Sequence, residues 1–247
     1  MAVEGLRVER INMKPIIFNT EAVRAIQDGR KTVTRRVLKP HNAVKANKLD
    51  YFQGNGLWYN DTIDNLDRDT HIKDCSVSPC WITTKAYIQK YAPYKAGDIL
   101  YVQETWCKLT DWEDQYPDSE EELMITYYKA DYQKDEWDMA EWRPSIRMPK
   151  EAARIFLQVT GVRVERLQDI TEGQAIREGC NGVFCGSGAN MGDGWGITPI
   201  DEYKPLWNST VKESDLAKYD WEVNPWVWVI EFDRISKEEA NGKENRT

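Results

Sequence analysis

WVWVIEFDRI, from Trp226 to Ile235, is an apolar run rich in β-branched and aromatic residues, and it predicts a strand near the end of the chain. A second run, ARIFLQVTGVRV at residues 153–164, predicts a long strand or a pair of strands. Shorter strands are expected upstream, at residues 15–18, 31–38, 99–105 and 124–130. Strands spread along the whole chain predict a mostly β, α+β fold: a β-barrel with short helices and long loop insertions.

Two short helices are expected between these strands, at residues 20–28 and 171–178. For the first, Thr20 is the expected N-cap and Gly29 the expected C′ residue. For the second, Thr171 and Gln174 have the spacing of a capping box, and Gly179 is the expected stop.

The 247 residues are enough for one large domain or two small ones. Because no linker stands out, we expect a single domain at residues 13–235, with insertions at about 40–95 and 180–222. Residues 1–12 form a polar N-terminal extension, and Met13 is an alternative start. Residues 236–247 are charged and lack apolar periodicity, so we expect a disordered tail.

The amino-acid composition limits the kinds of partner that the chain is expected to bind and the cellular compartment in which it is expected. The chain has 33 Lys and Arg against 41 Asp and Glu, a net charge of −8, which argues against broad, non-specific binding to DNA. Any nucleic-acid contact is therefore expected to be local and pocket-like. No apolar stretch is long enough for a membrane span. An odd number of cysteines, five, and no export signal predict free thiols in a reducing cytosol.

Four of the cysteines form two pairs of equal spacing, Cys75-x4-Cys80 and Cys180-x4-Cys185. Four thiolates arranged in this way predict a structural zinc site that ties the two inserted regions together. The spacing lies at the edge of the usual range for zinc ligands, and four free surface thiols explain it equally simply.

The densest chemical signal is GRKTVTRR at residues 29–36. A desolvated lysine amine beside a threonine is a known way to activate the hydroxyl as a nucleophile, which makes Lys31 and Thr34 candidates. In a regular strand the two would lie on opposite faces, so a turn or bulge must bring them together. Arg35 and Arg36 suit a phosphate or a base. A solvated basic edge strand explains the same residues.

The second signal is GDILYVQETW at residues 97–106, where Glu104 falls on the face that otherwise looks inward. A buried carboxylate has a raised pKa and needs a partner, and Lys31 is the expected partner. A purely structural salt bridge is the alternative.

These two segments, G-x-K-x-x-T-x-R followed by G-D-x-L-x-V-x-E-T-W, resemble the ASCH domain family, part of the PUA-like superfamily of small β-barrels. The stretches WRPSIRMP at residues 142–149, RIFLQVTGVRVERLQDIT from residue 154 and NPWVWVIEF at 224–232 resemble its phage and prophage branch. The resemblance covers most of residues 13–235.

The resemblance implies an RNA-binding or RNA-modifying protein. Small bacterial ASCH proteins are N(4)-acetylcytidine amidohydrolases, and their catalytic Lys, Thr and Glu fall on Lys31, Thr34 and Glu104 here. It therefore implies amide hydrolysis on an acylated nucleoside or a related modified base, with no cofactor required, in a bacterial cytosol or a phage-infected host. The surrounding residues that we expect to bind the substrate are Arg35, Arg36, Trp106, Trp142 and Ser145.

Alternatives remain open at this stage. Trp142 offers a ring for stacking on a base, and Ser145 offers a hydroxyl for a base edge. The same segment is equally consistent with a turn at Pro144 in which the Trp142 indole covers the core. A non-catalytic RNA- or nucleotide-binding module needs only the arginines and the aromatic residues. An ASCH-type ribonuclease is a third candidate.

Overall fold

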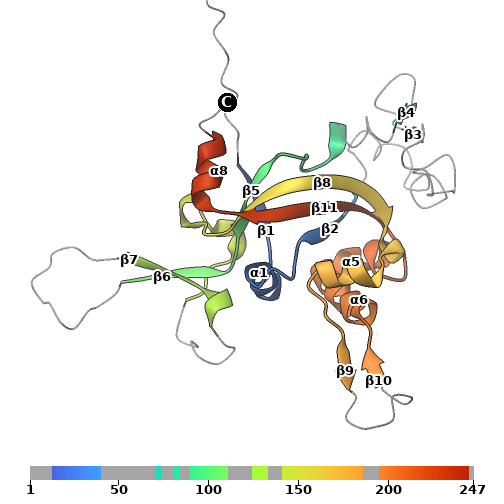
Figure 1. Ribbon diagram of the computed structural model, residues 1–247. Helices are drawn as coiled ribbons and strands as arrows, with labels where there is room; N and C mark the ends of the chain where they lie inside the picture. The colour runs from blue at the N-terminus through green and yellow to red at the C-terminus, as the bar shows by residue number, and fades with distance from the viewer. Residues whose placement is uncertain are drawn as a thin grey trace, which may run out of the picture.

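A five-stranded sheet in the order β1-β5-β8-β11-β2 forms the centre of the computed structural model (Figure 1). The structure describes residues 13–39, 71–73, 81–83, 90–110, 124–132, 141–185 and 195–244. The sheet strands are β1 (Lys14–Ile17), β2 (Val33–Val37), β5 (Ile99–Gln103), β8 (Phe156–Arg166) and β11 (Trp226–Ile235). β1 pairs with β5 in parallel, and the other neighbours are antiparallel.

Three two-stranded sheets and several helices surround this sheet. The small sheets pair β3 (His71–Lys73) with β4 (Trp81–Thr83), β6 (Trp106–Thr110) with β7 (Met124–Tyr128), and β9 (Val183–Cys185) with β10 (Trp195–Ile197). The α-helices are α1 (Thr20–Gln27), α5 (Glu172–Arg177), α6 (Pro199–Thr210), α7 (Leu216–Tyr219) and α8 (Lys237–Glu244). The architecture is α+β, and in the described residues the sheet does not close into a barrel.

The first half of β11 is covered on both faces, which explains the unbroken apolar run from Trp226 to Ile230. Trp228 and Ile230 pack on one face in a core shared with α1, while Val227 and Val229 pack on the other in a core shared with α5 and α6. All four side chains are buried. Since a strand alternates its side chains between faces, two covered faces require apolar residues at every position.

The ends of the first two helices test the capping predictions. Asn19, rather than Thr20, caps α1: its side chain accepts a hydrogen bond from the Ala22 N–H at 2.9 Å. The prediction of Thr20 was wrong because an asparagine one residue earlier supplies the same acceptor. The capping box of α5 is confirmed, with Thr171 and Gln174 exchanging side chain to backbone hydrogen bonds.

Other parts of the chain differ from the expectations. The strand expected at residues 99–105 ends at Gln103, and β6 begins three residues later at Trp106. The insertion expected at about 180–222 contains the paired strands β9 and β10 and continues into α6. The tail expected to be disordered carries α8, which packs on the core through the fully buried Ala240.

Parts of the sequence predictions lie outside the described residues. They are the polar extension at residues 1–12 and most of the insertion at 40–95. Within the ranges that are described, no helix combines the length and the apolar composition needed to cross a bilayer.

Candidate functional site

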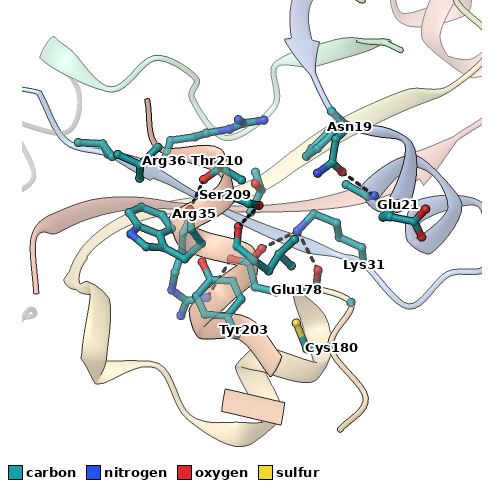
Figure 2. Close-up of a pocket in the computed structure, with 18 of the residues that line it drawn as sticks. Asn19, Glu21, Lys31, Arg35, Arg36, Glu178, Cys180, Tyr203, Ser209 and Thr210 are labelled. Carbon is teal, nitrogen blue, oxygen red and sulfur yellow. Dashed lines mark hydrogen bonds and ion pairs between the residues drawn. The ribbon is translucent and has the colours of Figure 1, made fainter. Parts of the chain in front are cut away.

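A cavity of about 810 Å³ opens beside β2, the edge strand of the sheet (Figure 2). Residues from α1 and the turn before it line one part of its wall, and residues from α6 and the end of α5 line another. Among the sequence-predicted residues, the cavity brings together Lys31, Thr34, Arg35 and Arg36. This volume is sufficient for a nucleoside-sized ligand.

The edge position of β2 explains how neighbouring residues reach one cavity. Thr34 and Arg36 pair with Ile230 and Trp228 and share the α1 face, whereas Arg35 points to the α6 face. An interior strand would separate these side chains into different layers, but beyond an edge strand the two faces meet. Lys31 precedes the strand and forms an isolated bridge with Glu178, so it does not follow the strand alternation.

A buried charge cluster forms the floor of the site. Lys31 Nζ donates to Glu178 Oε2 at 2.5 Å and to the Glu178 carbonyl at 3.0 Å. Arg35 Nη1 donates to the other carboxylate oxygen of Glu178 at 3.1 Å. The exposed fractions of the Lys31, Arg35 and Glu178 side chains are 6%, 0% and 3%. Figure 2 shows Lys31 and Glu178 pointing toward one another.

Arg35 also joins this cluster to the helix cap and to the sheet. Its Nη2 donates to Gln174 Oε1, the capping-box oxygen of α5, at 2.8 Å and to Glu165 Oε2 on β8 at 3.3 Å. The guanidinium therefore fixes the end of α5 against the sheet, and with it the Glu178 carboxylate. Arg35 Nε is buried without a hydrogen-bond partner.

Glu178 was missed by the sequence reasoning, although one signal pointed to it. It is the C-cap of α5, where the helix dipole disfavours a negative charge. A carboxylate at that position needs cations, and Lys31 and Arg35 supply them. The partners are far from Glu178 along the chain, since 147 residues separate it from Lys31.

Two lining residues keep unused hydrogen-bonding groups. The Thr34 side chain is buried, yet within the part of the chain that the structure describes its hydroxyl has no hydrogen-bond partner. Arg36 lies along another side of the cavity in Figure 2 and donates one hydrogen bond, from Nη2 to the Ile17 carbonyl at 2.6 Å. Both groups are therefore available to a ligand.

Glu104 lies away from this cavity. It is 1% exposed, as predicted, but its carboxylate forms a two-point ion pair with Arg154 at 2.9 and 3.0 Å. Burial raises the pKa of Glu104, and the hydrogen bonds from Arg154 oppose the rise. The expected pairing of Glu104 with Lys31 is therefore wrong, because each group has another partner.

The predicted substrate-binding residues after β5 also lie outside the cavity lining. Trp106 is buried in the core beneath the Arg143 guanidinium. Trp142 packs against Tyr132, with ring centroids 6.2 Å apart. Ser145 begins a short 3-10 turn that follows Pro144. The turn after Pro144 is therefore present, and base binding by Trp142 and Ser145 stays a prediction.

The aromatic wall of the cavity comes from α6, where no helix was expected. Tyr203 and Trp207 are buried, lie one turn apart and line the cavity. Burial raises the pKa of the Tyr203 hydroxyl well above its usual value, and the Glu178 charge raises it further. Thr198 as N-cap and Pro199 at the first helical position are typical of a helix start. Pro205 inside the helix is not typical of a helix interior, so the sequence pattern did not predict α6.

The four-cysteine zinc prediction is tested only in small part. Cys75 and Cys80 lie outside the described residues, and nothing is known of the Cys185 side chain. Cys180 is a buried free thiol that lines the cavity. In the described ranges there is no group of three or more His, Cys, Asp and Glu side chains placed to hold a metal ion. Zinc binding by the four cysteines stays a prediction.

The Cys180 thiol is expected to resist alkylation in the native protein. Burial, and then the nearby charges of Glu202 and Glu178, raise its pKa to about 12, so the reactive thiolate is scarce at neutral pH. Iodoacetamide treatment at pH 7.5 followed by peptide mass spectrometry measures this, with the urea-unfolded protein as the control. Rapid labelling of native Cys180 would contradict the buried, protonated thiol.

Comparison of the chain with protein-family models, with curated proteins and with solved structures finds no match.

Proposed function

We propose that this protein is a hydrolase that cleaves the amide of an acylated nucleoside, such as N(4)-acetylcytidine or a related modified base. The observation that carries the proposal is the meeting of Lys31, Thr34 and Glu178 in one cavity. A hydroxyl, an amine and a carboxylate in a partly enclosed site are the groups that acyl transfer to a side chain requires. Glu178 takes the carboxylate role that the sequence resemblance gave to Glu104.

The proposed reaction has two halves. Thr34 Oγ attacks the acyl carbonyl carbon, and its proton passes to the Lys31–Glu178 pair, which the 2.5 Å contact couples as one acid–base unit. The carbon–nitrogen bond then breaks, and the same proton leaves with the exocyclic amine. Water attacks the Thr34 ester, the pair again carries the proton, and the carboxylic acid departs with Thr34 restored. These steps need no cofactor.

The fold and location follow from the same resemblance. We propose a PUA-like ASCH fold, with the five-stranded sheet, which is open in the described residues, as part of the family's barrel. Its support is that the two matching motifs include residues of β2 and β5, strands of one sheet. The free thiols of Cys107 and Cys180 agree with a reducing bacterial or phage-infected cytosol.

Release of cytidine from N(4)-acetylcytidine, followed by chromatography, tests the proposal. Thr34→Val keeps the shape of the side chain but removes the hydroxyl, and it is expected to lower turnover by about a thousandfold or more. Thr34→Ser is the matched control, since it keeps a hydroxyl at the same position and is expected to retain part of the activity. Equal activity of the Val and Ser variants would refute Thr34 as the nucleophile.

The same assay separates the rival functions. A folded wild-type protein that releases no cytidine from N(4)-acetylcytidine, and no deacylated nucleoside from other acylated nucleosides, would contradict the hydrolase. RNA or nucleotide binding measured in that protein would then identify a binding module, and RNA cleavage would identify a ribonuclease.

A further inference from the structure

The charge of the cavity is opposite to the charge of the chain. The whole chain carries −8, yet the described lining residues include more cationic side chains than carboxylates. The cationic residues are Arg30, Lys31, Arg35, Arg36, Lys39 and Lys212, and the carboxylates are Glu21, Glu178, Glu202 and Asp215. A local excess of positive charge in an acidic protein attracts an anionic ligand to this cavity.

The carboxylates of the lining already have partners. Glu178 is held by Lys31 and Arg35, and each of the other three has a partner of its own. Glu21 pairs with Arg24 at 2.9 Å, Glu202 accepts from the Gly182 N–H at 2.7 Å, and Asp215 lies 3.9 Å from Lys39. None of them forms an ion pair with Arg36 or Lys212 in the part of the chain that the structure describes.

Arg36 is the better placed of these two cations, because Lys212 is exposed to solvent. The Arg36 guanidinium lies 5.2 Å from the centre of the Phe18 ring, directly after β1, and among the described residues it makes one hydrogen bond, to Ile17. A guanidinium has five N–H donors, so the described residues leave most of this donor fork unused. Burial lowers the pKa of Arg36, as expected for a cation taken from water with little compensation.

We propose that Arg36 anchors an oxyanion subsite in this cavity, so that the ligand carries a phosphate or a carboxylate that the guanidinium binds. A planar donor fork matches either group in a two-point contact. The inference rests on the proposed hydrolase and deepens it: the substrate is an acylated nucleotide, or a nucleoside with an acidic acyl group, rather than a neutral acylated nucleoside. Arg36 is a specificity residue and takes no part in proton transfer.

Binding without turnover gives the first test. Calorimetry on the wild-type protein compares the affinity for cytidine with that for cytidine 5′-monophosphate. Calorimetry on the Thr34→Val protein, which is expected to hydrolyse the acylated compounds very slowly, compares N(4)-acetylcytidine with N(4)-succinylcytidine. One anionic member of these pairs is expected to bind about 10- to 100-fold more tightly than its neutral partner. A gain for the monophosphate identifies a phosphate subsite, and a gain for the succinyl compound identifies a carboxylate subsite.

Two substitutions connect that gain to Arg36. Arg36→Gln is expected to remove the advantage of the anionic ligand and leave the affinity for the neutral ligand unchanged. Arg36→Lys keeps the positive charge but lacks the planar pair of N–H donors, so it is expected to retain part of the higher affinity for the anionic ligand. This variant is the control for a folding defect in Arg36→Gln. Equal affinity for both members of both pairs, or an advantage that survives in folded Arg36→Gln protein, would overturn the subsite.

Failure of the subsite and failure of the hydrolase are distinguishable. A protein that binds the monophosphate through Arg36 but hydrolyses neither acylated compound refutes the hydrolase and supports the subsite. Equal rates of hydrolysis of N(4)-acetylcytidine, its 5′-monophosphate and N(4)-succinylcytidine would refute the subsite and support the hydrolase.

Discussion

Glu178→Gln is expected to abolish amide hydrolysis and to lower the free energy of unfolding by about 3–5 kcal/mol, the usual effect of breaking a buried ion pair. The carboxylate pairs with both Lys31 and Arg35, whose side chains are buried. A glutamine at this position keeps the volume but leaves Lys31 without its counter-charge and Arg35 with Glu165 alone, at 3.3 Å. It also removes the proton acceptor from the proposed acid–base pair, which we expect to lower turnover by at least about 100-fold.

The measurements are turnover of N(4)-acetylcytidine and urea unfolding of the same preparations. Glu104→Gln is the matched control: it also removes one charge of a buried ion pair, but outside the cavity. Its partner Arg154 keeps Asp131 at 2.6 Å, so the variant is expected to lose stability and retain turnover per folded molecule. Lost turnover in Glu104→Gln with retained turnover in Glu178→Gln would reverse the assignment of the carboxylate.

Phe232→Ala is expected to lower the free energy of unfolding by about 3–5 kcal/mol, since it leaves a cavity in a tightly packed core. Phe232 is 2% exposed and lies on β11. Its ring centroid is 6.2 Å from that of Phe18, whose own ring lies near Lys31 and Arg36. Loss of Phe232 therefore weakens the support beneath the cavity as well as the core.

Urea unfolding again measures the change. Val223→Ala is the control, because Val223 is 45% exposed and its truncation is expected to change stability by less than about 0.5 kcal/mol. Equal stability of the Phe232→Ala protein and the wild type would show that this part of the core repacks around the missing ring.

The sequence predicted the fold correctly where the local residue pattern agrees with the tertiary environment. β11 matches its predicted bounds, and the covering of both faces of its first half explains the apolar run from Trp226 to Ile230 that predicted it. α6 was missed because a helix with Pro205 inside it departs from the local pattern, and burial of Tyr203 and Trp207 stabilises it instead. Helical stability of this kind comes from packing and is invisible in local sequence.

The sequence predicted only the part of the candidate site that comes from the GRKTVTRR segment at residues 29–36. The GRKTVTRR segment correctly predicted that Lys31 and Thr34 share a cavity, because both belong to one short stretch of chain. The expected pairing of Lys31 with Glu104 was wrong because burial of a carboxylate does not determine its partner. Glu104 is buried as its strand alternation predicts, yet its partner is Arg154, and Lys31 pairs with Glu178. Such pairings depend on how distant segments meet in three dimensions.

The order of strands in the sheet delays completion of the site during synthesis. β2, which carries Thr34, leaves the ribosome early, but its neighbour in the sheet is β11, the last strand of the described chain. Glu178 also emerges well after Lys31. A nascent chain that ends before Trp226 therefore has Thr34 and Lys31 without the strand that pairs with β2. The candidate site is complete only after β11 has been made.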